Sequence, residues 1–315
     1  MSGKTNHTSL LVEIARLYYE HNFSQQKIAN KLDISRPGVS RLLQQARNRG
    51  IVRIEIFDPT ENGTLLEEKM QKKFGLKKVI VVPNDNEETQ IIKKRLGRVA
   101  VTLLEQLVEE GLILGVSWGT TMQEVAKQVR RKSVKDMTVV QLNGGISRAE
   151  YDTHASEIAQ KISEKYQAIP FLLPLPAIVD SAELKQAIIY DKNISRTLDL
   201  ARKAKVAIFT IGSFNHDSVL VKADYFETKE VDSLLKRGAV GDICSRIITH
   251  DGKICSPELN SRTIGIELEE LRKKPYSIAV AGGKEKLQAI HAGLRGHLFN
   301  VFITDEWVAE ELLRD

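Results

Sequence analysis

Six short apolar runs, separated by amphipathic helical stretches, constrain the fold of this chain more than any other feature of its sequence. An alternation of strand-like and helix-like segments is typical of an α/β domain with a mostly parallel sheet and helices on both faces. We therefore expect a Rossmann-like sheet with ligands bound beyond the carboxyl ends of its strands. The predicted strands are Val79–Val82, Leu112–Val116, Thr138–Leu142, Ala207–Ile211, Ile278–Ala281 and Val301–Thr304.

The first fifty residues follow a different pattern, which predicts a small helical domain. Apolar residues at helical spacing indicate a first helix that ends near residues 21–22. Ser24 can cap a second helix over Gln25–Leu32, and Ser35 can cap a third that ends before Gly50. Two short helices joined by a tight turn match the helix-turn-helix, whose second helix enters the major groove of DNA.

The polar face of the third helix has side chains suited to DNA. Arginine can bond guanine, glutamine can bond adenine, and serine can hold a phosphate. A helical bundle with a solvated polar face would show the same apolar stripes, but the charge distribution favours DNA. Residues 1–57 hold nine of the 46 Lys and Arg and four of the 41 Asp and Glu, so the rest of the chain is balanced. The expected DNA contacts are Ser35, Arg36, Pro37, Ser40, Arg41, Gln44 and Gln45.

A domain boundary is expected shortly after the third helix. Ile51–Phe57 alternates apolar and charged residues, which predicts a strand that would serve as a wing. A polar, glycine-containing stretch follows at residues 61–64. We therefore expect a DNA-binding domain over residues 1–60 and a ligand-binding and oligomerisation domain over residues 61–315.

The loop Gly115–Thr121 is a candidate anion site, because it is rich in hydroxyls and precedes a helix expected from Thr120. A helix N-terminus offers unpaired N–H groups and the positive end of a dipole, which favour a phosphate. A structural interpretation, in which Gly119 forms the turn and a hydroxyl caps the helix, explains the same letters. Lys286 could pair with phosphate, and Asp242 could accept hydrogen bonds from sugar hydroxyls.

The same loop also spells G-x-S-x-G, the nucleophile elbow of α/β-hydrolases. Under that interpretation Ser117 is the nucleophile, and Asp242 and His291 complete a triad in the required order. The motif is short, and a DNA-binding domain has no role in ester hydrolysis. We therefore favour ligand binding without catalysis.

The two cysteines, Cys244 and Cys255, lie on either side of an Asp-Gly pair at 251–252 that predicts a two-residue hairpin turn. That register places Cys255 opposite Ile248, so we expect two reduced, structural thiols. The seven histidines are scattered and no C-x-x-C spacing occurs, so neither a metal nor a cofactor is expected.

The N-terminus is too polar for a signal peptide, and no apolar run approaches the roughly 18 residues of a membrane span. These features predict a cytoplasmic protein without a membrane partner.

Four segments together resemble the SorC family of sugar-binding transcriptional regulators, and the similarity spans nearly the whole chain. They are Ser35–Leu43, Gly115–Thr121, Gly241–Ile243 and the Gly282-Gly283-x-x-Lys286 pattern. The resemblance implies an oligomer, commonly a tetramer, that binds operator DNA and responds to a sugar phosphate. It also implies an effector domain similar to phosphosugar isomerases and deaminases that has lost catalysis. A repressor of sugar or deoxyribonucleoside catabolism genes is therefore expected.

The resemblance also assigns residues to the effector site. Ser117, Gly119, Thr120 and Thr121 would hold the phosphate together with Lys286, and Asp242 would contact the sugar.

One position departs from related regulators of deoxyribonucleoside genes, which carry a lysine able to form a Schiff base before the Gly144-Gly145 pair. Here that residue is Asn143, and an amide cannot form an imine, so Asn143 and Gly144 would line a noncovalent site. The effector would be deoxyribose 5-phosphate or another pentose or hexose phosphate. The alternative is a phosphosugar isomerase or deaminase whose N-terminal helices only assemble subunits.

Overall fold

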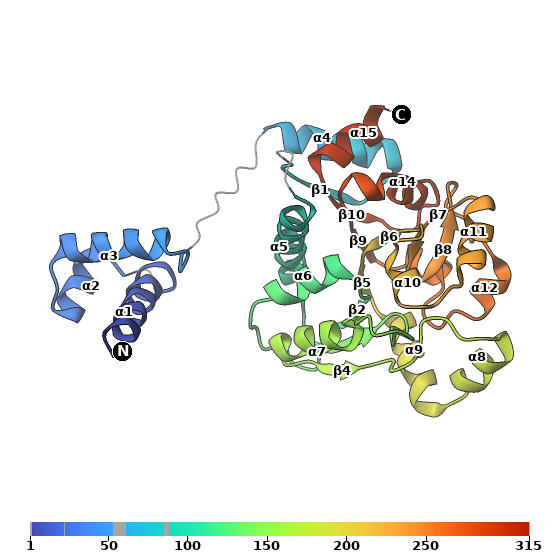
Figure 1. Cartoon of the computed structure of the whole chain (residues 1–315), viewed down its shortest axis with the longest axis horizontal. Helices are drawn as coiled ribbons and strands as arrows, with labels where there is room; N and C mark the ends of the chain where they lie inside the picture. Colours follow the sequence, from blue (N-terminus) through green and yellow to red (C-terminus); the bar gives the residue numbers. More distant parts are fainter. Residues whose placement is uncertain (1, 22, 53–60, 85–87, 315) are drawn as a thin grey trace. The chain divides into compact units, whose positions relative to one another are not determined.

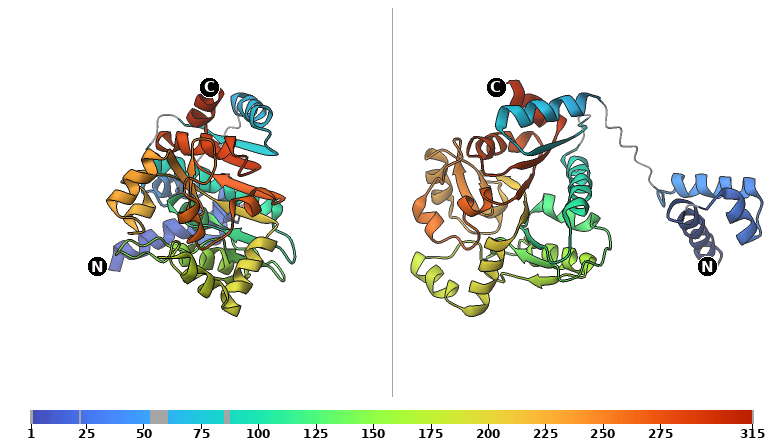
Figure 2. Two further views of the ribbon diagram at one scale, coloured as in Figure 1. Left: turned by 90° about the vertical axis from the view of Figure 1, so that its right-hand side faces the viewer. Right: turned by 180° about the vertical axis from the view of Figure 1, so that it is seen from behind.

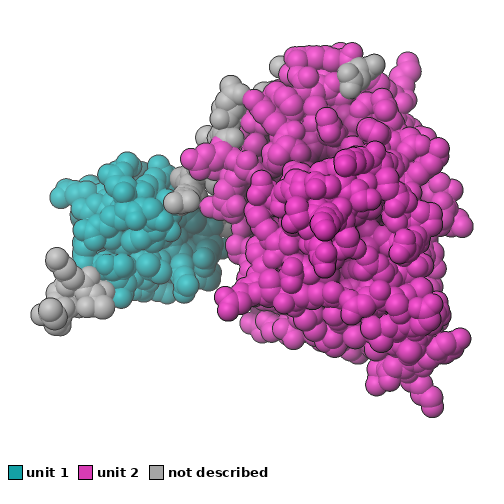
Figure 3. Space-filling model, turned by 45° about the vertical axis from the view of Figure 1, so that its right-hand side comes forward, with its two compact units in different colours: residues 1–59 teal, residues 60–315 magenta. Residues whose placement is uncertain are grey.

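The computed structural model describes residues 2–21, 23–52, 61–84 and 88–314. The chain forms two compact units, an N-terminal unit of residues 1–59 and a C-terminal unit of residues 60–315 (Figure 1 and Figure 3). Each unit has hydrophobic clusters of its own. The two units therefore have separate cores.

The N-terminal unit consists of α1 (Ser2–Tyr19), α2 (Gln25–Leu32) and α3 (Arg36–Asn48), which confirms the three predicted helices. Its caps form as expected, since Ser24 Oγ accepts a hydrogen bond from Lys27 N and Ser35 Oγ accepts one from Gly38 N. The core of the unit joins all three helices through Ile14, Leu17, Ile28, Ala29, Val39 and Leu43.

The structure describes only the first two residues of the strand predicted over residues 51–57. Ile51 and Val52 form a bend and pack beside Leu11 and Ala46. Residues 53–57 lie outside the described residues, so the wing stays a prediction.

A seven-stranded sheet, parallel throughout, forms the centre of the C-terminal unit and confirms the predicted fold class. Its strand order is β1-β10-β9-β5-β2-β3-β4, so the last strand along the chain lies between β1 and β9. All six predicted runs lie in or next to strands. The strands are β1 (Lys78–Val82), β2 (Ile113–Val116), β3 (Thr138–Gln141), β4 (Ile169–Phe171), β5 (Val206–Phe209), β9 (Tyr276–Val280) and β10 (Val301–Asp305).

Helices cover both faces of this sheet (Figure 1 and Figure 2). Alternate strand residues belong to two separate apolar clusters, because successive side chains of a strand point to opposite faces. One cluster includes α5 (Thr89–Leu107), α6 (Thr120–Gln128), α7 (Ala155–Tyr166) and α11 (Thr228–Lys236). The other includes α4 (Glu61–Phe74), α9 (Lys192–Lys203), α14 (Leu287–Arg295) and α15 (Glu306–Arg314). The shorter helices are α8 (Ala182–Ile189), α10 (Val219–Lys222), α12 (Pro257–Ser261), α13 (Leu268–Arg272) and the 3₁₀ turn η1 (Lys284–Lys286).

A second, antiparallel sheet has the order β6 (Ile211–Ser213), β7 (Ala239–Ile243) and β8 (Arg246–Thr249). The β7–β8 turn consists of Cys244 and Ser245, with φ angles of 50° and 65°. Two positive φ angles are typical of a type I′ hairpin turn. This hairpin lacks the usual sequence signal, because Asn and Gly are the usual residues of such a turn.

The hairpin predicted at residues 251–252 exists, but its predicted register is wrong by one residue. Thr249 N donates to Lys253 O, and Ile248 bridges Ile254, so three residues form the loop. Cys255 N consequently donates to Ile247 O and not to Ile248. The expectation of reduced thiols is confirmed, since both cysteines are free and buried. Among the described residues, none of the helices is both long and apolar enough for a membrane span.

Candidate functional site

The exposed side of α3 presents most of the residues predicted to contact DNA. Val39, Leu43 and Ala46 are buried against the other helices, which turns the opposite side of α3 outward. The exposed members of the predicted set are Ser35, Arg36, Pro37, Ser40, Arg41 and Gln44.

Gln45 differs from the rest of that set because it is partly buried on the side of α3 that faces α1. Its Oε1 lies 3.2 Å from Nε2 of His7, a residue that the sequence analysis did not single out. Gln45 therefore belongs to the flank of α3 and not to its open face.

A cavity of about 300 Å³ lies beyond the carboxyl ends of β2, β3 and β5 and reaches the β7–β8 turn. Its volume is at the lower end of the usual range for small-molecule sites. Most of the residues predicted from the sequence line it together: Ser117, Gly119, Thr120, Asn143, Asp242 and Lys286.

Two predicted effector contacts, Thr121 and Gly144, do not line this cavity. Thr121 is only 1% exposed within α6. Gly144 O accepts a hydrogen bond from Trp118 Nε1 at 2.8 Å, and a Cβ at Gly144 would lie 2.5 Å from Pro176 O. A glycine is thus needed at 144 for close backbone packing behind the cavity. Gly144 does not line the cavity, so its predicted contact with the ligand is wrong for this site.

The loop between β2 and α6 brings a helix N-terminus to the cavity. Gly119 is the N-cap of α6 with φ at 124°, and no side chain caps the helix there. Trp118 fixes the loop through its bond to Gly144 O, and this requires a glycine at 145, where a Cβ would lie 2.8 Å from Trp118 Nε1. The backbone N–H groups of the first turn of α6 can therefore meet an anion.

Asp242 and Asn143 form the polar wall around the β7–β8 turn. Ser245 N donates to Asp242 Oδ2 at 3.2 Å, and Asn143 Nδ2 donates to Ser245 Oγ at 2.8 Å. The partner of Asp242 on β6 is Gly212, where a Cβ would lie 2.1 Å from Asp242 Oδ1. Burial raises the pKa of Asp242 to about 6, opposed by the Ser245 hydrogen bond and by the charge of Lys286.

Lys286 places a positive charge in the same cavity although only 9% of it is exposed. Its Nζ donates to Thr210 Oγ1 at 3.2 Å. Burial lowers its pKa to about 8, and the nearby Lys93 acts in the same direction, whereas Glu285 and Asp242 oppose the shift. A bound anion would offset both the desolvation and the repulsion between the two lysines.

Several lining residues were not predicted from the sequence. Lys93 comes from α5 and Tyr151 from a loop after β3. Thr210 lies between β5 and β6, and Ser213 is the last residue of β6. Residues 217–220 and Lys222 close another side. Only Thr210 had a usable signal, because it lies in the strand predicted at 207–211.

The cavity does not assemble the triad of the hydrolase interpretation. Ser117 and Asp242 line it, but His291 is not a lining residue. His291 lies on α14, and its ring contacts Phe74 with centroids 6.3 Å apart. No histidine lies among the cavity-lining residues that the structure describes, and no group of three or more His, Cys, Asp or Glu there could hold a metal ion.

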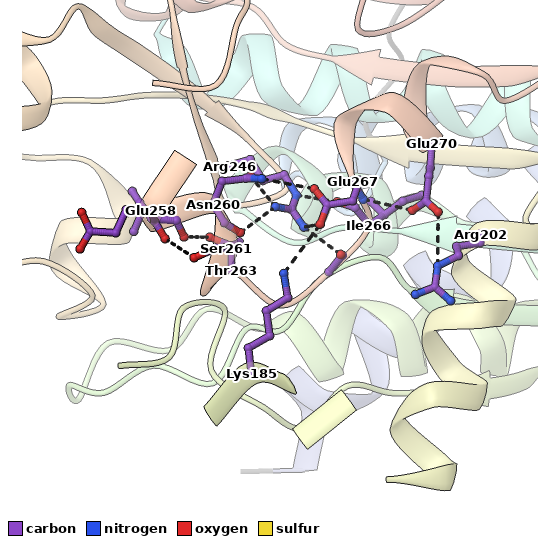
Figure 4. A network of polar contacts seen from close by, with 12 residues as sticks. Lys185, Arg202, Arg246, Glu258, Asn260, Ser261, Thr263, Ile266, Glu267 and Glu270 are labelled. Atoms are coloured by element: carbon purple, nitrogen blue, oxygen red, sulfur yellow. Dashed lines mark hydrogen bonds and ion pairs between the residues drawn. The ribbon is translucent and has the colours of Figure 1, made fainter. Parts of the chain in front are cut away.

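Arg246, the residue after the β7–β8 turn, fixes a strap of chain behind the cavity (Figure 4). Its buried guanidinium donates to Ile266 O at 2.7 Å, to Gly265 O at 3.0 Å and to Glu267 Oε1 at 2.8 Å. Gly265 in turn pairs with Asn143 in an isolated β-bridge. The position of Asn143 therefore depends on Arg246.

Comparisons with known proteins agree with this architecture. The model of the sugar-binding domain family (Sugar-bind) matches residues 58–314. The chain is 42% identical over 306 residues to the deoxyribonucleoside regulator of Bacillus subtilis, covering 97% of each chain. It is 32% identical over 310 residues to the sorbitol operon regulator of Klebsiella pneumoniae, covering 97% of this chain and 98% of the relative. The crystal structure of full-length SorC from Klebsiella pneumoniae superposes with a TM-score of 0.82 at 30% identity, over 97% of this chain and 98% of that one.

Proposed function

The chain belongs to the SorC family of sugar-responsive, DNA-binding transcriptional regulators, and we propose that it represses a catabolic operon until a phosphorylated sugar binds its C-terminal unit. The observation that carries this proposal is the joint placement of Lys286, Asp242 and the N-terminus of α6 around one cavity. A positive charge and a carboxylate that accepts hydrogen bonds, both in one lining, suit a ligand that carries a phosphate and hydroxyl groups.

The phosphate would lie against the first turn of α6, with Ser117 and Thr120 as hydroxyl donors and Lys286 as the charged partner. Lys93 is a second cation within the same lining. The sugar hydroxyls would meet Asp242, whose carboxylate accepts hydrogen bonds. Binding is noncovalent at Asn143, since an amide does not form an imine.

The nature of the sugar is the next part of the proposal. A relative at 42% identity is named a deoxyribonucleoside regulator, which favours deoxyribose 5-phosphate. Another relative is named a sorbitol operon regulator, so other pentose and hexose phosphates belong in the same screen. The ligand class is therefore small sugar phosphates.

The exposed face of α3 would read operator DNA from the major groove. Arg36 and Arg41 carry the charge on that face, and Gln44 offers an amide that can bond adenine. Operators commonly present two half-sites to a two-fold symmetric protein, and we therefore propose a homo-oligomer, a tetramer by family resemblance. Its place is the cytoplasm, where the operon is.

We propose that the protein binds its sugar phosphate without converting it. The relatives are named regulators, and the lining of the cavity supplies no imidazole for proton transfer among the residues described. Asp242 then serves as a hydrogen-bond acceptor and not as a catalytic base.

The test combines two measurements on the full chain. A labelled duplex from upstream of its own operon is titrated with protein, alone and with each sugar phosphate of a panel, while the same panel is screened by thermal shift. We expect one sugar phosphate to raise the melting temperature and to weaken DNA binding. A matching assay follows consumption of that sugar phosphate. Steady turnover together with no DNA binding would contradict the proposal and support an enzyme.

A further inference from the structure

The amino-terminal edge of the parallel sheet carries exposed lysines that the proposed function does not use. We call them the basic edge. They lie at or just before the first residues of β1, β5 and β9, whereas the cavity lies beyond the carboxyl ends of strands in the same sheet. The members are Lys77, Lys78, Lys203, Lys205 and Lys273, all of them exposed.

Contacts between their segments keep the five lysines at one edge. Lys77 Nζ lies 3.6 Å from the ring centroid of Tyr276 and donates to Pro275 O. Tyr276 N donates to Lys205 O at 3.1 Å. Because β1, β10, β9 and β5 are successive neighbours, the basic edge spans three strand spacings, about 15 Å.

A buried lysine anchors the centre of this edge. Lys274 is 4% exposed, and its Nζ donates to the carbonyl oxygens of Ala201, Arg202 and Ala204. These bonds tie the start of β9 to the end of α9, which carries Lys203. The exposed lysines are thus held on ordered backbone.

The charge of the basic edge is only partly balanced by nearby acidic side chains. Glu67 is close enough for its carboxyl group to interact with the charge of Lys78. The other nearby carboxylates have arginine partners, since Asp199 and Glu270 pair with Arg202, and Glu269 pairs with Arg272. Throughout the part of the chain that the structure describes, none of the five lysines forms an ion pair. This local excess of positive charge is not visible in the composition, because residues 58–315 hold equal numbers of basic and acidic residues.

We propose that the basic edge binds the phosphate backbone of duplex DNA that flanks the sequence read by α3. The proposal rests on the proposed function. A duplex carries one negative charge per roughly 1.7 Å of its axis, so a lysine row of about 15 Å can meet several phosphates. Phosphate contacts of this kind position a protein without reading sequence.

Chain length keeps flanking DNA within reach. Nine residue steps from Val52 to Glu61 span at most about 32 Å. The 14 residues of α4 add about 21 Å and end three residues before Lys77. The three residue steps from Phe74 to Lys77 add at most about 11 Å. Lys77 therefore stays within roughly 64 Å of Val52, less than two full turns of DNA (about 68 Å).

The test uses the full-length protein and two duplexes from its own promoter region. The core duplex is limited to positions at which base changes alter binding, and the flanked duplex adds about 20 base pairs of arbitrary sequence on each side. The edge variant carries Lys78→Gln, Lys203→Gln, Lys205→Gln and Lys273→Gln. Lys77 is kept because it packs on Tyr276. The control variant changes four exposed lysines elsewhere: Lys192→Gln, Lys229→Gln, Lys236→Gln and Lys253→Gln.

We expect the wild type to bind the flanked duplex more tightly than the core duplex, and the edge variant to lose this difference. The slope of log Kd against log salt on flanked DNA should fall by about 2 to 4 in the edge variant, since each lost phosphate contact contributes roughly 0.9. Binding to the core duplex should stay within about twofold, and the control variant should behave as the wild type.

Three results would overturn the proposal. The edge variant could keep the wild-type preference for flanked DNA, or the control variant could lose it equally, which would indicate net charge alone. Light scattering could show that the edge variant no longer assembles, with equal losses on both duplexes, which would assign the edge to contacts between copies of the chain. If the wild-type protein does not bind the core duplex, that result would instead contradict the proposed function itself.

Discussion

The face of α3 and the cavity of the C-terminal unit are assembled in opposite ways. The exposed residues predicted to contact DNA lie within ten consecutive positions, Ser35–Gln44, and one cap and one buried stripe orient them all. The cavity collects residues from Lys93 to Lys286, carried by separate strands, helices and turns. Substitutions in α3 should therefore act locally, whereas substitutions around the cavity should act through the packing of the whole unit.

Arg246→Leu should have the largest effect, a loss of stability of the C-terminal unit. It would show how far the cavity depends on residues packed behind it. The substitution leaves Gly265 O and Ile266 O without their donor in a buried place. We expect the free energy of unfolding of the C-terminal unit to fall by about 3 kcal/mol. Chemical denaturation of the full chain, followed by circular dichroism, measures the change.

Lys185→Met is the matched control for Arg246, because Lys185 reaches the same Glu267 over a longer 3.7 Å contact. Lys185→Met should lower the free energy of unfolding by less than about 1 kcal/mol. Equal losses in the two variants would contradict a specific role for the Arg246 guanidinium.

Lys286→Met should have the second-largest effect. It should weaken effector binding and leave the fold intact. Removal of a charged partner from a phosphate in a desolvated site corresponds to about 30- to 100-fold weaker binding. Calorimetric titration with the active sugar phosphate measures it. Lys284→Met is the control, since Lys284 is exposed and does not line the cavity. A wild-type Kd in the Lys286 variant would move the phosphate site elsewhere.

Arg41→Ala should produce the complementary result in the other unit. We expect operator affinity to fall about 10- to 100-fold, because an exposed arginine on the face of α3 proposed to enter the major groove can bond a base or a phosphate. The thermal shift caused by the sugar phosphate should stay unchanged. Loss of both properties together would show that the two regions are not separable in the way described.

The affinity for the sugar phosphate should be greatest between about pH 6 and pH 8. Lys286 is charged below its pKa of about 8 and loses that charge as the pH rises. Asp242 is ionised above its pKa of about 6 and gains a proton as the pH falls. At pH 9 we expect about tenfold weaker binding in calorimetric titration. Below about pH 6, protonation of Asp242 and of the ligand's phosphate should both weaken binding. Asp242→Asn should remove the part of this fall in affinity that Asp242 causes. An unaltered fall in affinity below pH 6 would contradict this role of Asp242.

Ser35→Ala should have the smallest effect, confined to the N-terminal unit. Loss of the Ser35 cap should lower the stability of that unit by about 1 kcal/mol. Ser35→Asp, which restores a side-chain acceptor, should recover most of it. Thermal melting of the full chain, read in the transition of the N-terminal unit, measures the loss. A shift in the C-terminal transition would contradict a local role.

The sequence predicts the elements that short-range signals define. The starts of α2 and α3 match the prediction, because Ser24 and Ser35 cap these helices through bonds to residues only three positions away. Six of the seven parallel strands of the C-terminal unit are predictable, because each contains a short apolar run. The strand β4 is not, since it has three residues and contains Pro170.

The cavity was predictable only in part, because its lining depends on contacts between distant segments. The predicted loops do meet, as parallel strands bring their carboxyl ends together. Lys93 and Tyr151 had no local signal, and their place follows from helix and loop packing. The three-residue loop at 250–252 shows a further limit, since one added residue shifts every cross-strand partner.

The place of β10 between β1 and β9 has a consequence for synthesis. The large sheet stays divided until the ribosome has released the last fifteen residues of the chain, whereas all three helices of the N-terminal unit emerge early. A truncated product would keep α1, α2 and α3 but lack the completed sheet. Under the proposed function, premature termination would therefore separate the helices proposed to bind DNA from the proposed sugar-phosphate site.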